Sequence, residues 1–233
     1  MLLLPVVAAM ASCTVGGGQG SVTGTLNVAD CWSGKFDLQP DFFGATPFHD
    51  QLTFRIQRGS DFENFSDGVS ILVSDGTYVR GPGLGKPLSV DLPPGVTPPG
   101  VPVKAVKDPA VIQVALNLQR SCRPTTPALY GVAEATTNAD GTCDDATVKA
   151  ALQCDAAPPA VHRSTITFQH LFTGNPDEAD ADKRKTEASF DVYLADPREI
   201  CAGGLGPPPP CRGHIQGSFS FFFERGRPAQ VFP

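Results

Sequence analysis

The sequence has little positive charge. Its 233 residues include 18 Lys and Arg against 24 Asp and Glu, which gives a formal net charge of -6. A protein with this charge has no general electrostatic attraction to nucleic acid or to anionic lipid headgroups. We therefore expect no nucleic-acid partner.

Motifs that would identify a reaction are also absent from the sequence. It contains no Gly-x-Ser-x-Gly elbow of the serine hydrolases, and no glycine-rich phosphate loop follows a strand-like segment. Four histidines are present, none with HExxH spacing or with a cysteine at zinc-finger spacing: His49, His162, His170 and His214. We interpret each as a surface or strand-edge residue and assign no catalytic residue.

The apolar run at the start of the chain is too short for a membrane-spanning helix. It extends from Leu2 to Met10, whereas such a helix takes about 20 residues. Its length and its lack of charge are typical of the hydrophobic region of a secretory signal peptide. We therefore expect an exported protein.

The residues that follow, Met10-Ala11-Ser12-Cys13, resemble a bacterial lipobox, in which small residues precede a cysteine that becomes acylated and N-terminal. Met10 stands where this family usually has Leu. The resemblance implies that residues 1–12 are a signal peptide and that Cys13 anchors a cell-envelope lipoprotein in the membrane through its acyl chains. The residue after Cys13 is Thr14 and not Asp. In the sorting pattern of enteric bacteria, the absence of Asp at this position favours the outer membrane.

Cysteine parity favours this interpretation over ordinary cleavage. A small-x-small site at Ala9-Met10-Ala11 would release a chain beginning at Ser12 with all seven cysteines in an oxidising compartment. Acylation of Cys13 leaves an even set of six, enough for three disulfides. These six are Cys31, Cys122, Cys143, Cys154, Cys201 and Cys211. Cys201 and Cys211 bracket a short, turn-rich interval, so we predict that they pair with each other.

Alternating apolar and polar residues predict strands through most of the remaining chain. Its 24 glycines and 23 prolines indicate many turns and long loops. We interpret residues 13–20 as the lipidated cysteine and a flexible glycine tether with a reach on the order of 15 Å. Residues 21–233 are then expected to form one antiparallel β-sandwich of roughly eight to ten strands. The strands are predicted at 21–28, 36–38, 51–58, 69–74, 77–79, 88–92, 111–118, 164–171, 188–194 and 214–224.

Some local patterns add detail to this fold. The first and last strands share a pattern, Val22-x-Gly24-x-Leu26 and Ile215-x-Gly217-x-Phe219, which suggests that they pair. Phe42, Phe43 and Phe48 lie in a loop bounded by proline and glycine that we expect to fold onto the core.

A turn and a short helix are also expected. Asp75-Gly76 predicts a hairpin turn into strand 77–79. A short helix is predicted from Asp144 to Gln153, which would hold Cys143 and Cys154 too far apart to pair.

Two acidic clusters were considered as calcium sites. Asp61, Glu63 and Asp67 are weak candidates, because loops between strands of exported β-domains are a natural place for hard cations. The second cluster is Asp177, Glu178, Asp180 and Asp182, but the basic residues 183–185 follow it directly and indicate a solvated loop. Calcium is therefore the one cofactor that the sequence suggests.

The sequence leaves three functional hypotheses. The first is a non-enzymatic binding or structural role at the envelope, with a protein or carbohydrate ligand contacted by the loops at 81–102 and 123–159. The second is an envelope hydrolase whose His and Asp residues converge only in the fold. The third is a secreted eukaryotic domain glycosylated at Asn64, which an acylated Cys13 would contradict. The segment from Leu52 to Asp75 and the phenylalanine-rich end resemble uncharacterised lipoproteins and imply no activity.

Overall fold

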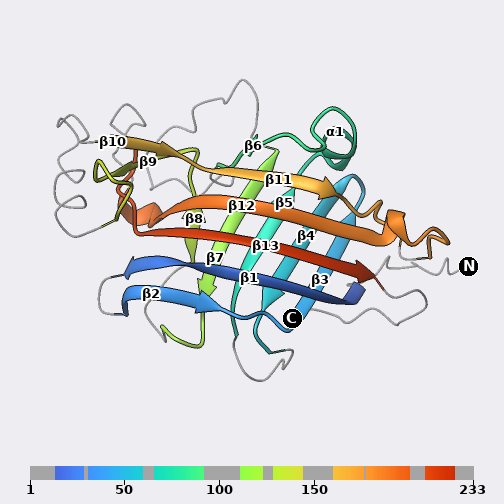
Figure 1. Cartoon of the computed structure of the whole chain (residues 1–233), viewed down its shortest axis with the longest axis horizontal. Coiled ribbons are helices and arrows are strands. Elements are labelled where there is room, and N and C mark those ends of the chain that lie inside the picture. Colours follow the sequence, from blue (N-terminus) through green and yellow to red (C-terminus); the bar gives the residue numbers. More distant parts are fainter. Residues whose placement is uncertain are drawn as a thin grey trace, which may run out of the picture.

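The chain folds almost entirely into antiparallel β-strands, which confirms the predicted all-β class (Figure 1). A computed structural model describes residues 14–28, 31–59, 66–91, 111–122, 128–143, 160–175, 177–199 and 208–223. These residues hold thirteen strands, one short α-helix and two 3-10 turns. No helix among them is long and apolar enough to cross a membrane.

The strands are β1 (Thr14–Val28), β2 (Trp32–Leu38), β3 (Phe42–Phe48), β4 (Gln51–Gln57), β5 (Asp67–Val73), β6 (Leu88–Ser89), β7 (Ile112–Leu118), β8 (Leu129–Gly131), β9 (Glu134–Thr137), β10 (Ala160–Arg163), β11 (Thr165–His170), β12 (Lys185–Ala195) and β13 (Gly213–Phe223). The helix is α1 (Gly76–Arg80), and the 3-10 turns are η1 (Asp182–Arg184) and η2 (Pro197–Glu199). The prediction of eight to ten strands is too low, because strands of two to four residues, such as β6 and β8, are too short to show alternation.

Hydrogen bonding arranges the strands in two layers that are joined at both sides. The front layer has the order β2-β1-β13-β12-β11-β6, and the back layer has the order β3-β4-β5-β7-β8. Two strands belong to both layers: β1 also pairs with β3 through Thr14–Gly16, and β12 also pairs with β8 through Leu194 and Ala195. The pairing therefore closes into a circuit of eight strands, β13-β1-β3-β4-β5-β7-β8-β12 and back to β13. Figure 1 shows the front strands crossing the back strands at a steep angle, as in orthogonally packed sheets.

Phenylalanine side chains from the two layers meet in the core. Phe221 of β13 stacks on Phe43 of β3 with ring centroids 5.6 Å apart, and it meets Phe54 of β4 edge-on at 6.1 Å. Phe54 also packs against Phe168 of β11. All four rings are fully buried. Aromatic pairs of this kind contribute about 0.5–1.5 kcal/mol each beyond the burial of their area, so they hold the layers together.

The predicted glycine tether is wrong, because Thr14–Gly20 forms the first half of β1. Gly16 to Gly20 pair with Phe223 to Phe219 of β13. A Cβ atom on Gly18 would lie 2.3 Å from the Cβ of Phe221, so only glycine lets the two backbones approach this closely. The glycines therefore pack the strand tightly instead of making it flexible.

The predicted pairing of the first and last strands is confirmed. In the register of β1 with β13, Val22 lies opposite Gly217 and Gly24 lies opposite Ile215. Each small residue thus faces a large one. The shared small-residue pattern that suggested the pairing is part of how the two strands fit together.

Two local predictions fail for identifiable reasons. The segment 77–79 lies in α1 and not in a strand, because the Asp75 carboxylate caps the helix by accepting from Tyr78 N at 2.7 Å. Asp50 holds the same turn by accepting from the Arg80 guanidinium at 2.9 Å. The expected loop around Phe42 and Phe43 is β3, in which both rings are buried, whereas Phe48 at its end is 60% exposed and does not join the core.

The disulfides connect distant segments and not neighbouring ones. Cys31 pairs with Cys122 across 91 residues, with Cα atoms 5.3 Å apart. Cys211 pairs with Cys143, with Cα atoms 5.2 Å apart, so the predicted Cys201–Cys211 pair is wrong. Cys211 belongs to a small second hydrophobic cluster, and Cys143 packs against that cluster, so this disulfide joins segments that are remote in sequence. The other members of the cluster are Val132, Ala135, Tyr193 and Ala195. Cys13, Cys154, Cys201 and the predicted helix at 144–153 lie outside the described residues.

Replacing Gly24 with alanine is expected to lower the free energy of unfolding by about 3 kcal/mol. The new Cβ would lie 2.0 Å from the backbone oxygen of His214 and 2.9 Å from the Cα of Ile215, so β1 and β13 would have to separate. Gly17→Ala is the matched control in the same strand, because nothing lies within 4 Å of its Cβ position, and a change within about 0.5 kcal/mol is expected there. Urea unfolding with the disulfides intact measures both variants. Equal midpoints would contradict the close packing.

Peptide mapping of the non-reduced protein tests the disulfides. We expect one cross-linked peptide pair containing Cys31 and Cys122 and another containing Cys143 and Cys211. If Cys13 carries lipid, counting leaves Cys154 and Cys201 as the third pair. A peptide pair that joins Cys201 to Cys211 would contradict this arrangement.

Candidate functional site

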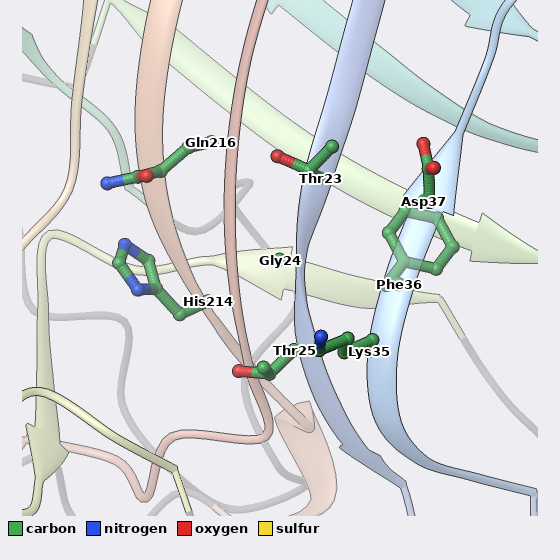
Figure 2. A pocket seen from close by; sticks show the side chains of 8 residues that line it. All are labelled: Thr23, Gly24, Thr25, Lys35, Phe36, Asp37, His214 and Gln216. Carbon is green, nitrogen blue, oxygen red and sulfur yellow. The ribbon is translucent and has the colours of Figure 1, made fainter.

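An open groove lies on the outer face of the front layer, over β2, β1 and β13 (Figure 2). Its volume is about 430 Å³, and its lining residues are Thr23, Gly24, Thr25, Lys35, Phe36, Asp37, His214 and Gln216. The polar side chains of the lining come from the alternate positions of each strand that face away from the core. The groove is therefore a product of the same alternation that builds the core.

The strand register sorts these side chains into two rows across the sheet. The first row is Asp37, Thr23, Gln216 and Asp191, and the second is Lys35, Thr25, His214 and Tyr193. Each row crosses β2, β1, β13 and β12. Because neighbouring strands lie about 4.8 Å apart, each row is roughly 14 Å long. Three of these four strands, β2, β1 and β13, line the groove itself.

Asp191 fixes the two side chains on β13. Its Oδ1 lies 2.6 Å from Nε2 of His214, and its Oδ2 accepts from Nε2 of Gln216 at 2.7 Å. In Figure 2 both side chains extend from β13 away from β1. An ionised carboxylate only accepts hydrogen bonds, so this contact places a hydrogen on Nε2 of His214, and in the tautomer that carries only this hydrogen Nδ1 is an acceptor.

Tyr193 supports the His214 ring from the neighbouring strand. The two rings are stacked, with centroids 4.1 Å apart and an interplanar angle of 4°. Burial raises the pKa of the Tyr193 hydroxyl, and the negative charge of Asp191 adds to the rise. Tyr193 therefore remains neutral, and the aromatic stack and the carboxylate together hold the imidazole in one orientation.

The centre of the groove presents polar groups that have no partner within the described residues. These groups are the hydroxyls of Thr23 and Thr25 and the ammonium of Lys35, whereas Asp37 accepts a hydrogen bond from Gln39 at 2.6 Å. Thr23 and Thr25 are exposed and lie on β1, which is paired on both sides at this point. Two hydroxyls and one cation on a rigid sheet are suited to hydrogen bonding with a polar ligand.

The arrangement contains part of an acid–base system. A carboxylate that orients a histidine is the supporting half of a nucleophilic triad. Thr25 lies directly opposite His214 in the register, yet no hydrogen bond joins its hydroxyl to the ring among the described contacts. The described groove therefore has a base and its orienting group without an attached nucleophile.

The other three histidines do not line this groove, although the His162 ring packs against Tyr193 with centroids 5.5 Å apart. His49 lies at the tip of the β3–β4 hairpin with φ of 54° and its ring against Phe48. His162 of β10 lies with Nδ1 2.7 Å from the Thr137 hydroxyl, and His170 is exposed at the end of β11. The interpretation as a surface or strand-edge residue fails clearly for His214, because Asp191 and Tyr193 hold its ring in place on the sheet.

The suggested calcium ligands are only partly within the described structure. Asp61 and Glu63 lie outside it. Both Asp67 oxygens accept from the turn after β7: Oδ1 from the Arg120 and Ser121 backbone at 3.0 and 3.1 Å, and Oδ2 from the Ser121 hydroxyl. The described ranges contain no group of three His, Cys, Asp or Glu side chains placed to hold a metal.

The second acidic cluster forms local turns. Asp182 N donates to Asp180 Oδ1 at 3.1 Å, and Asp177 N donates to Asn175 at the same distance. The Lys183 ammonium lies 4.0 Å from Asp180. Carboxylates that accept from their own loop and pair with an adjacent cation are typical of a solvated surface segment.

The groove residues were not identified as a site from the sequence. Alternation placed Thr23 and Thr25 on the polar face of the first strand, but it did not show which strands lie beside them. Asp191 is more than 160 residues away in the chain from Thr25, and only the register brings it near. Of the loops expected to contact ligand, 81–102 and 123–159, residues 92–102, 123–127 and 144–159 lie outside the described structure.

Comparison with known proteins adds no assignment to this geometry. No protein-family model, no curated protein and no solved structure matches the chain.

Proposed function

We propose that this protein is an exported, lipid-anchored lipoprotein of the bacterial cell envelope that binds a polar ligand without transforming it. The anchor is the acylated Cys13, and the membrane is the outer membrane, because Thr14 and not Asp follows the lipidated cysteine. The binding site is the groove over β2, β1 and β13. The ligand is a carbohydrate or peptide component of the envelope.

The observation that carries the binding role is the set of unpartnered polar groups in the groove. Thr23, Thr25 and Lys35 offer hydroxyl and ammonium groups from adjacent strands, and the strands hold them at fixed spacing. A ligand with several hydroxyl or amide groups satisfies such a row without any loop rearrangement. The two disulfides suit an exported protein, because disulfides persist in oxidising compartments.

One observation favours the second candidate, an envelope hydrolase. The 2.6 Å contact between His214 and Asp191 leaves Nδ1 as an acceptor that is able to take a proton from water or from a hydroxyl. The binding role is preferred because no nucleophile is hydrogen-bonded to that imidazole within the described residues. Both candidates use the same groove and are separated by whether the ligand is cleaved.

Intact mass and membrane partitioning of the native protein test the anchor. The wild type is expected to carry acyl chains on Cys13 and to partition into membranes, because two or more chains give stable attachment. The Cys13→Ser variant is expected to be unacylated and to remain in the aqueous phase. A wild-type protein that is soluble and unacylated would contradict the proposed localisation.

Titration with soluble peptidoglycan fragments, which carry both sugar and peptide groups, tests the groove. We expect amide chemical-shift changes on β1, β2 and β13, and an affinity about tenfold weaker for the Thr23→Val, Thr25→Val double variant, which loses two hydroxyls. Thr167→Val, on the outer face of β11, is the matched control and should bind as the wild type does. Mass analysis of the fragments after incubation separates the candidates: cleavage that the Asp191→Asn variant loses would replace the binding role by the hydrolase.

A further inference from the structure

The residue proposed to carry the lipid is joined directly to the folded sheet. Cys13 immediately precedes Thr14, and Thr14 pairs with Ala45 of β3 as the first residue of β1. A single peptide unit spans only 3.8 Å between Cα atoms. Acyl chains on Cys13 would therefore hold this end of the sandwich at the membrane with no intervening linker.

The elements around the start of β1 define one end of the molecule. Thr14–Gly16 lie beside β3, and Gly17 lies opposite Phe222 near the end of β13. Phe222 in turn lies opposite Lys185 at the start of β12. Figure 1 shows the N-terminal end of β1, the end of β13 and the start of β12 together at the right-hand side.

Hydrogen bonds connect this end to α1 and to the tip of the β3–β4 hairpin. The Arg184 guanidinium donates to the Phe223 carbonyl at 2.6 Å, next to Phe222. Arg80 of α1 donates to the Phe172 carbonyl at 3.0 Å and also to Asp50 at the hairpin tip. The Phe172 ring packs against that of Phe223 at a tilt of 35°, with ring centroids 4.1 Å apart. The hairpin tip, α1 and the last residues of β13 are thus linked through one set of contacts.

Exposed apolar side chains gather on these linked elements. Five large hydrophobic residues in the described structure are exposed, and four of them lie here: Phe48 at 60%, Tyr78 at 41%, Leu84 at 40% and Phe222 at 42%. Phe48 ends β3, Tyr78 lies in α1, and Leu84 follows α1 in the next turn. The fifth, Val161, lies on β10, near the opposite end of the view in Figure 1.

We propose that this end of the sandwich rests on the lipid bilayer that holds the Cys13 anchor, with Phe48, Tyr78, Leu84 and Phe222 as its contacts. The proposal rests on the proposed acylation of Cys13. The occupant is a bilayer because the chain reaches its anchor from this end with no spare length. Apolar contact carries the interaction, since the net charge of -6 gives no general attraction to anionic lipids.

The surroundings of Phe222 suit the boundary between lipid and water. The Lys185 ammonium lies 5.8 Å from the centre of the Phe222 ring and also pairs with the Glu187 carboxylate. An aromatic ring at the level of the headgroups beside a lysine that extends toward water is typical of interfacial contacts. The groove is held away from the bilayer, because His214 and Phe222 are eight residues apart along β13, or roughly 27 Å.

Quenching of single tryptophans by brominated lipid tests this orientation. The full-length acylated protein is placed in phosphatidylethanolamine and phosphatidylglycerol vesicles with brominated acyl chains, in a Trp32→Phe background that removes the one native tryptophan. We expect the Phe48→Trp and Phe222→Trp variants each to lose about half of their fluorescence, since tryptophan at these positions would lie at the membrane interface. Val161→Trp is the matched control, with 41% exposure against 42% for Phe222, and should keep its fluorescence.

The outcomes separate this inference from the anchoring on which it rests. Intact mass of the same samples shows whether Cys13 is acylated. Acylated protein in which the Phe48→Trp or the Phe222→Trp variant is quenched no more than Val161→Trp would overturn the end-on orientation alone. Protein without acyl chains would overturn both the anchoring and this inference.

Discussion

The structure depends on the close approach of the β1 backbone to β13. At Gly18 and Gly24 the neighbouring strand occupies the space of a side chain, with atoms 2.3 and 2.0 Å from the Cβ positions. This contact joins the first strand to the last and so closes the circuit of eight strands. It also sets the register that places polar residues of β2, β1, β13 and β12 in rows on the outer face. The core between the layers and the groove on the outer face therefore both depend on the close pairing of β1 with β13.

The two faces of the front layer have opposite roles. The inner face supplies Phe221 to an aromatic core in which the back layer contributes Phe43 and Phe54. On the outer face, Asp191 and Tyr193 hold His214, while the hydroxyls nearer β2 have no partner within the described residues. At the β13 edge of the groove, the His214 side chain is therefore fixed by contacts within the protein. At its centre, the threonine hydroxyls are available to hydrogen-bond with a ligand. The outer face of the sheet thus supplies both the fixed side chains and the available hydroxyls, with no contribution from a large loop.

Local patterns were enough for much of the fold and for little of the site. Alternation predicts most of the longer strands, and the shared glycine pattern indicates that β1 and β13 pair. Glycine composition alone does not distinguish a flexible tether from a tightly packed strand, because the difference lies in the phenylalanines of β13 some 200 residues away. The same distance defeats the disulfide prediction: Cys211 has a near neighbour in sequence, yet it pairs with Cys143 across 68 residues. The groove was not predictable because its residues come from separate strands, and the pairing register of those strands is not visible in any single segment of the sequence.

The closure of the sheet by β1 and β13 also constrains when the protein is able to fold. β1 is paired along most of its length with a strand that lies far downstream: Gly16 pairs with Phe223, 207 residues later, and Leu26 pairs with Gly213, 187 residues later. Pairing across such a separation requires the whole intervening chain, and its loop-closure entropy is lost late. In a growing chain the glycine-rich half of β1 therefore lacks this partner until Gly213–Phe223 has been synthesised. The last strand to be made, and not the first, therefore sets the moment at which the sheet is able to close.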